Sequence, residues 1–110
     1  MSRANTIAPA QALRLVDLIT PTPQGIASRV LAKNAGGNVT LFAFSEGEGL
    51  SEHTAPFDAL VIVVSGSLTL TIGGEPIVAT AGDIVRMPAS VPHAVDATEA
   101  SRMLLVMLRE

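Results

Sequence analysis

One stretch of the chain decides the fold: Leu68-Thr-Leu-Thr-Ile72, then Gly73-Gly74, then Glu75-Pro-Ile-Val-Ala79. Two runs rich in β-branched residues flank a pair of glycines, and glycine readily adopts the positive φ angles of a two-residue hairpin turn. The stretch therefore predicts two antiparallel strands joined by a tight turn.

The rest of the chain continues this pattern of short apolar runs broken by glycine, proline or serine. After residue 20, no segment keeps its apolar residues at helical spacing. Short strands at such intervals are typical of an all-β sandwich or barrel. We expect strands at residues 27–32, 38–44, 58–64, 68–72, 76–80, 84–87, 93–97 and 102–108.

Two short turns help to predict how these strands pair. Ser65-Gly66-Ser67 and Ala81-Gly82-Asp83 leave no room for a crossover helix, so we expect each to turn one strand into an antiparallel neighbour. Residues 60–64 are apolar on both faces of their strand. Such a strand is either central in a sandwich or covered by a partner, and we expect a homodimer.

The length of 110 residues fits one compact domain, residues 1–110. Pro21, Pro23 and Gly25 set residues 1–25 apart as an N-terminal arm or strand, and residues 10–19 favour a strand over a short helix. Residues 45–56 carry no pattern that predicts an element.

Composition excludes several classes of function. The net charge is -3 and there is no basic run, so a nucleic-acid partner is not expected. The chain contains no cysteine, which excludes a disulfide framework and a thiolate nucleophile. No apolar run is long enough to cross a bilayer, and the N-terminus lacks the apolar core of a signal peptide. We therefore expect a cytoplasmic protein without a membrane partner.

Residues 47–66 resemble the first sequence motif of the cupin family: a glycine, five residues, His-x-His, three or four residues, a glutamate, six residues and a glycine. Gly47, His53 and Gly66 match this motif. The second histidine of the motif is Ala55 here, and the glutamate is Ala59.

Residues 82–97 resemble the second cupin motif: a glycine, five residues, Pro-x-Gly, two residues, a histidine, three residues and an asparagine. Gly82, Pro88 and His93 match, whereas the glycine after the proline is Ser90 and the asparagine is Ala97. The fifteen residues between the motifs are similar to the shortest linkers of the family. The resemblance implies an antiparallel double-stranded β-helix, the jelly-roll barrel of cupins.

The resemblance also implies where chemistry would take place. In cupins, three histidines and a glutamate commonly hold iron, manganese, zinc or nickel, and only His53 and His93 carry over. Asp58 lies next to the glutamate position, where strand alternation would turn it outward unless a bulge after Pro56 turned it inward. Without a metal, the two imidazoles would be hydrogen-bonded caps on an apolar cavity.

The expected function is that of a small single-domain cupin that binds a small organic ligand in its barrel. Any divalent metal would be held by His53 and His93, and the sequence does not decide whether the protein is an enzyme. The alternative is a metal-free ligand-binding or structural module without catalysis. The residues expected to line the pocket are Ala55, Ala59, Met87, Phe42 and Phe44. For the two phenylalanines and the methionine, the alternative role is core packing.

Overall fold

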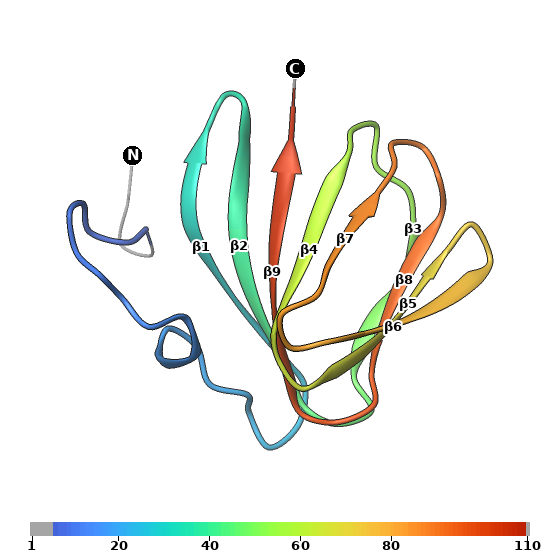
Figure 1. Ribbon diagram of the computed structural model, residues 1–110, viewed down its shortest axis with the longest axis horizontal. Coiled ribbons are helices and arrows are strands. Elements are labelled where there is room, and N and C mark those ends of the chain that lie inside the picture. Colours follow the sequence, from blue (N-terminus) through green and yellow to red (C-terminus); the bar gives the residue numbers. More distant parts are fainter. Residues whose placement is uncertain (1–5, 110) are drawn as a thin grey trace.

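The computed structural model describes residues 6–109, which form nine strands and one short 3-10 helix (Figure 1). The elements are η1 (Leu15–Asp17), β1 (Ile26–Asn34), β2 (Gly37–Phe44), β3 (Gly49–His53), β4 (Ala59–Ser65), β5 (Ser67–Ile72), β6 (Glu75–Thr80), β7 (Ile84–Met87), β8 (His93–Ala97) and β9 (Ser101–Leu108). No helix within this part of the chain is long and apolar enough to span a membrane.

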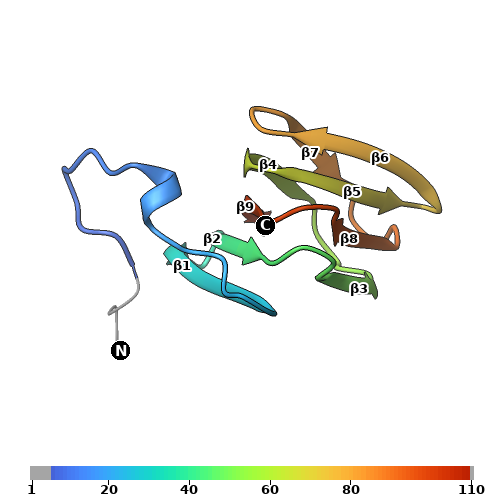
Figure 2. The ribbon, with the colours of Figure 1, turned by 90° about the horizontal axis from the view of Figure 1, so that it is seen from below.

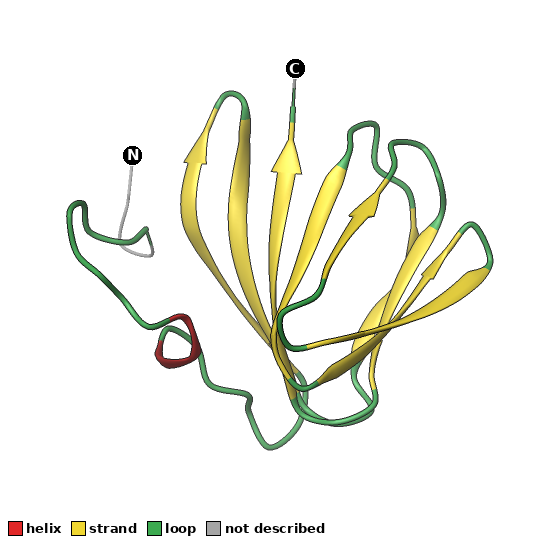
Figure 3. Cartoon of the chain, in the orientation of Figure 1, coloured by secondary structure: helices red, strands yellow, loops and turns green. Residues whose placement is uncertain are grey.

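The strands form two sheets, and every strand pairing is antiparallel. A five-stranded sheet has the order β1-β2-β9-β4-β7, and a four-stranded sheet has the order β3-β8-β5-β6. Figure 2 shows the sheets as two layers that face each other, and Figure 3 shows that the body consists mostly of strands. The predicted all-β class with antiparallel sheets is confirmed.

The hairpin that the sequence predicts is present between β5 and β6. Ile72 pairs with Glu75, and the two residues between them, Gly73 and Gly74, have φ angles of 58° and 85°. Both turn positions thus lie in the left-handed region, where a residue with a Cβ atom is strained.

The expectation that the turns at residues 65–67 and 81–83 join paired neighbours is wrong. β4 and β5 belong to different sheets, as do β6 and β7, so each turn carries the chain from one layer to the other. The second crossing is hydrogen-bonded to β4, since Val63 N–H donates to Asp83 O at 2.9 Å and Gly82 N–H donates to Val63 O at 2.9 Å. Together β4–β5 and β6–β7 form one long ribbon that bends across both sheets.

Gly66 makes the first of these crossings possible. Its φ is +84°, and a Cβ atom there would collide with the hydroxyl of Ser101. That hydroxyl is buried and accepts a hydrogen bond from Ser67 N–H at 3.0 Å. The bend therefore packs closely against β9 at Gly66, and only glycine fits this position without strain.

All eight predicted strands are present, with bounds shifted by at most two residues, but β3 was missed in the unassigned segment 45–56. The strand expected at residues 10–19 is wrong. Described residues 6–25 contain no strand, and they form an arm with one 3-10 turn; residues 1–5 lie outside the described part. Pro21 and Pro23 lack the N–H that a sheet ladder requires, which favours an arm at this point.

The interior between the sheets is filled by aliphatic side chains at alternate strand positions. Val61 and Val63 of β4 are at most 1% exposed, and Leu68 and Leu70 of β5 are fully buried. The period of two that the sequence shows is thus the period of burial. The core cluster comprises Phe44, Ala59, Val61, Val63, Leu68, Leu70, Ala79, Met87, Val95, Ala97, Met103 and Leu105.

Candidate two-histidine site

Both histidines lie at the same end of the four-stranded sheet, where β3 ends and β8 begins. They are direct partners in the β3–β8 ladder. His93 occupies the same face of β8 as Val95 and Ala97, which are core residues, and its side chain is only 5% exposed. His53 is exposed. One imidazole is therefore fixed by packing, and the other closes the site toward solvent.

The two rings approach each other through a single atom of each. The Nε2 atoms are 3.1 Å apart, and the ring planes cross at 73° with centroids 4.3 Å apart. The edge-on arrangement directs both Nε2 atoms toward one point rather than stacking the rings.

The other nitrogen of each ring contacts a main-chain carbonyl. His53 Nδ1 donates to Ser51 O at 2.8 Å, and His93 Nδ1 donates to Val91 O at 3.1 Å. Because a carbonyl oxygen can only accept, both Nδ1 atoms must carry a proton. Each Nε2 is then left with its lone pair unless a further proton is added.

Two facing lone pairs at this distance repel each other unless something positive lies between them. A direct N–H···N bond would place one additional proton on the pair and give it a charge of about +1. A metal ion would use both lone pairs at once, with the Nδ1 protons held by carbonyls as is usual for metal-bound histidines. A proton or a metal ion between the two Nε2 atoms would remove this repulsion.

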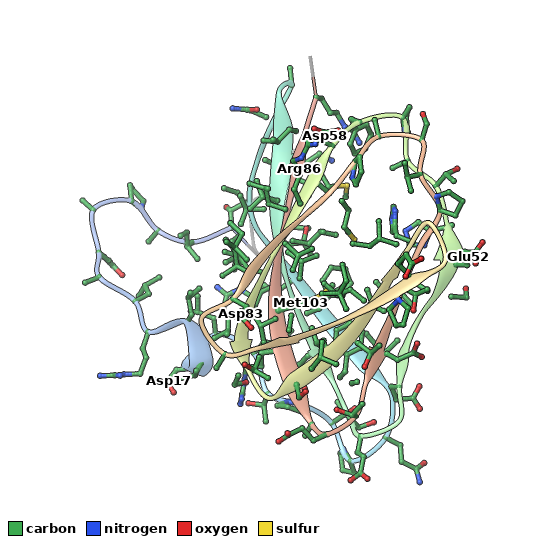
Figure 4. The ribbon with its side chains drawn as sticks, turned by 45° about the vertical axis from the view of Figure 1, so that its right-hand side comes forward. Asp17, Glu52, Asp58, Asp83, Arg86 and Met103 are labelled. Atoms are coloured by element: carbon green, nitrogen blue, oxygen red, sulfur yellow. The ribbon has the colours of Figure 1, made fainter. Side chains whose placement is uncertain are left out.

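The described residues bring no third histidine and no cysteine, aspartate or glutamate side chain to this point. No group of three or more histidine, cysteine, aspartate or glutamate side chains suited to a metal ion occurs among residues 6–109. Glu52, next to His53, is exposed and points away from the body (Figure 4). The donor set fits a metal ion held by two imidazoles, with water or a bound ligand completing the coordination.

Asp58 is engaged elsewhere, at the start of β4. One carboxylate oxygen accepts from Arg86 Nη1 at 2.8 Å and the other from Ala89 N–H at 2.8 Å. Figure 4 shows Asp58 and Arg86 side by side. Ala59 points into the core, so the side chain of Asp58 lies on the opposite face, as strand alternation requires. Sequence reasoning missed this link, and the backbone N–H of Ala89 leaves no signal in a sequence.

The residues expected to line a pocket lie on or near the interior. Ala59 and Met87 pair across β4 and β7 and are 5% and 3% exposed. Phe44 is fully buried and Phe42 partly, with ring centroids 6.0 Å apart and planes at 9°. Ala55 is half-buried, and its carbonyl accepts from Ser90 N–H at 2.7 Å. That they line a ligand pocket stays a prediction.

Neither histidine lines either of two surface cavities. One of about 420 Å³ is lined by the β1–β2 hairpin and the end of β9. The other, of about 750 Å³, is lined by Pro56, Phe57, Asp58, Ala89, Leu108 and Arg109. In the second cavity, the Arg109 guanidinium lies 5.1 Å from the centroid of the Phe57 ring.

A family model described as the cupin domain matches residues 40–108. The chain belongs to the cupin family. The match covers both sequence motifs and all strands from within β2 to β9, so the jelly-roll barrel predicted from the motifs is confirmed. No curated protein matches the chain significantly.

Solved structures support this assignment. A conserved protein of unknown function from Streptococcus pyogenes is 34% identical with a TM-score of 0.91, over 100% of this chain and 96% of the other. A cupin superfamily protein from Desulfitobacterium hafniense is 26% identical with a TM-score of 0.88, over 96% of each chain. A cupin 2 conserved barrel domain protein from Leptotrichia buccalis is 33% identical with a TM-score of 0.85, over 88% of this chain and 47% of the other.

Proposed function

We propose that this cupin binds a small organic ligand at the His53–His93 end of its barrel and holds a divalent metal ion there. The observation that carries the proposal is the 3.1 Å separation of two Nε2 atoms whose Nδ1 partners are both main-chain carbonyls. This arrangement fixes the ring orientations and leaves two lone pairs for one cation.

The distance between the nitrogens suits two ligands of one ion. With metal–nitrogen bonds of about 2.1 Å, a separation of 3.1 Å subtends an angle of about 95° at the ion. Neighbouring ligands in octahedral and tetrahedral complexes are separated by angles close to this or somewhat wider. Little movement of either ring is therefore needed to accept iron, manganese, nickel or zinc.

Because the protein supplies only two donors, we expect a substrate or effector to bind at the metal. Two protein donors leave at least two positions for water or for a donor atom of a ligand. An ion held in this way would supply Lewis-acid polarisation, or activation of water or dioxygen. The apolar interior side chains near these strand ends, such as Ala59 and Met87, favour a ligand with an apolar part.

The location we propose for the protein is the cytoplasm. The absence of cysteine agrees with the reducing conditions there.

The test is the metal content of protein purified without chelators and then exposed to iron, manganese, nickel or zinc. We expect about one metal ion per chain, lost in both His53→Ala and His93→Ala. Glu52→Gln is the matched control, because Glu52 is adjacent to His53 but exposed and directed away, and it should keep the metal.

Two results would overturn the metal proposal. One is a wild-type protein that takes up none of the four metals, which would leave a metal-free binding module. The other is a His53→Ala variant that retains full metal occupancy. A ligand screen by thermal shift tests the binding role separately, since a ligand that binds the native state must raise the melting temperature.

A further inference from the structure

The cavity of about 750 Å³ lies at the end of the barrel where β9 ends. Figure 1 shows that the β3–β4 loop and the β7–β8 loop reach the same end. The first loop contributes Phe57 and Asp58 to the lining, the second contributes Ala89, and the end of β9 contributes Leu108 and Arg109. Small-molecule sites commonly have volumes of about 300–1,000 Å³, so the cavity is large enough for an organic ligand.

Arg109 provides the cavity with a cation that is held in place. Its N–H donates to Gly36 O at 2.7 Å, and the N–H of Leu108 donates to Asp58 O at 3.0 Å, so the backbone is fixed on both sides of the cavity. Among residues 6–109, no carboxylate lies within ion-pair distance of the Arg109 guanidinium. The described part of the chain thus leaves this cation without a counter-ion.

The aromatic ring of Phe57 positions the guanidinium. The other two aromatic residues of the chain, Phe42 and Phe44, stack on each other at the core, whereas Phe57 is half-buried in the β3–β4 loop. The Arg109 guanidinium lies 5.1 Å from the centroid of the Phe57 ring, within the range of a cation–π attraction. A ring does not use the N–H groups as a carboxylate does, so these donors remain available to an acceptor.

Asp58 is the one acidic residue of the lining, and its charge is balanced within the protein. One carboxylate oxygen accepts from Arg86 Nη1 and the other from Ala89 N–H, both at 2.8 Å. Because Arg86 neutralises Asp58, the net charge at the cavity is the positive charge of Arg109. The electrostatics therefore favour an anionic ligand with a single charge.

Hydrogen bonds between the two loops form the wall of the cavity before any ligand is bound. Ala89 N–H donates to the carboxylate of Asp58, and Ser90 N–H donates to Ala55 O at 2.7 Å. The loops are thus joined at two points. A site whose walls are already in place needs little ordering when a ligand binds, which reduces the entropic cost of binding.

The remaining lining side chains are apolar and accessible to a ligand. Pro56 is exposed, Leu108 is 48% exposed and Ala89 is half-buried. An organic body that covers these side chains would remove apolar surface from water, which is favourable. The cavity therefore combines one unpaired cation with an apolar surface.

We propose that this cavity binds a small organic carboxylate, with the carboxylate on the Arg109 guanidinium and the apolar body against Pro56, Ala89 and Leu108. The planar fork of a guanidinium matches a carboxylate with two parallel hydrogen bonds. A single arginine suits a single negative charge, whereas a phosphate monoester carries up to two at neutral pH. The proposal is independent of the metal site, since neither histidine lines this cavity.

The experiment is a titration of the metal-free protein with 4-phenylbutyrate, followed by the amide chemical shifts in NMR spectra. Metal-free protein excludes binding of the carboxylate to a metal ion, so the result does not depend on the proposed function. We expect saturable shift changes at the described lining residues, centred on Phe57 and Arg109. The neutral analogue 4-phenylbutanamide and the more highly charged phenyl phosphate should each bind more weakly.

Variants of Arg109 test the role of the guanidinium. We expect Arg109→Gln to raise the dissociation constant of 4-phenylbutyrate at least tenfold, because a charged hydrogen-bonded pair is lost. Arg109→Lys should raise it less, because lysine keeps the charge but lacks the planar fork. Arg14→Gln is the matched control, because Arg14 is an arginine on the arm whose side chain is 78% exposed, and this variant should bind as the wild type does.

Three results would overturn the proposal. The first is the absence of saturable shift changes at the lining residues up to millimolar concentrations of 4-phenylbutyrate. The second is a dissociation constant that Arg109→Gln leaves unchanged or that the neutral amide equals. The third is a set of shift changes centred on His53 and His93 instead of Phe57 and Arg109, which would place the carboxylate at the histidine pair.

Discussion

The Nε2 atoms of His53 and His93 lie 3.1 Å apart, although 40 positions separate the two residues in the sequence. Their environments differ, since His93 is 5% exposed and His53 is exposed. We therefore expect the two histidines to contribute unequally to the free energy of unfolding, although they share the proposed role of binding a cation.

Removal of either imidazole should abolish metal binding but change stability unequally. In the metal-free protein, we expect His93→Ala to lower the free energy of unfolding by about 1–3 kcal/mol, because it leaves a cavity beside the core, and His53→Ala to change it by no more than about 0.5 kcal/mol. Urea denaturation in the presence of a chelator measures both values. Equal destabilisation by the two variants would contradict the asymmetric burial.

Restoration of the cupin ligand positions should strengthen metal binding. Ala59 stands where the family has a glutamate and Ala55 where it has a histidine, and Ala59 faces the interior at 5% exposure. We expect Ala55→His/Ala59→Glu to bind divalent metal at least tenfold more tightly than the wild type, by isothermal titration calorimetry.

The same double variant should be less stable than the wild type without metal, because an unpaired buried carboxylate is costly, and should recover when metal is added. Ala97→Glu, a core position on β8 away from the rim, is the control that should lose stability without any recovery. Unchanged metal affinity in the double variant would show that Ala55 and Ala59 do not face the histidine pair.

Ser90→Gly should stabilise the protein. Ser90 has a φ of 65°, a left-handed conformation that glycine adopts without strain, and the family motif has glycine at this position. We expect a gain of about 1 kcal/mol in the free energy of unfolding from relief of this strain. Ser28→Gly, on an exposed position of β1 with an ordinary φ, should instead destabilise, and thermal unfolding of the two variants gives the comparison.

Asp58→Ala should destabilise more than Arg86→Ala. Loss of the arginine removes the ion pair with Asp58. Because the arginine side chain is 64% exposed, this pair contributes no more than about 0.5 kcal/mol to the free energy of unfolding. Loss of the carboxylate also leaves the Ala89 N–H without its acceptor, which costs about 1–2 kcal/mol more. Equal losses of stability in denaturant titrations would mean that Asp58 stabilises the protein through the ion pair and not through the hydrogen bond to the backbone.

Local patterns in the sequence predicted much of this fold. Alternating apolar residues predicted eight of the strands, and the glycine pair predicted the β5–β6 hairpin. β3 was missed because Gly49-Leu-Ser-Glu-His53 has only one large apolar residue, and its strand conformation comes from pairing with β8. The crossings at Gly66 and Gly82 were misread, since a turn residue signals a change of direction but not which sheet receives the next strand.

The sequence by itself determined the all-β class and the cupin motifs, and it marked His53 and His93 as the candidate site residues. Apolar periodicity, glycine placement and residue spacing are properties of the chain order, and these features follow from them. The tertiary structure alone decided that the two Nε2 atoms meet, that Asp58 is held by Arg86 and Ala89, and that residues 6–25 form an arm. Each of these depends on backbone carbonyl and N–H groups or on strand pairing between distant segments. Apart from proline, which lacks the N–H, every residue carries the same backbone groups, so a sequence does not reveal which of them will be brought together.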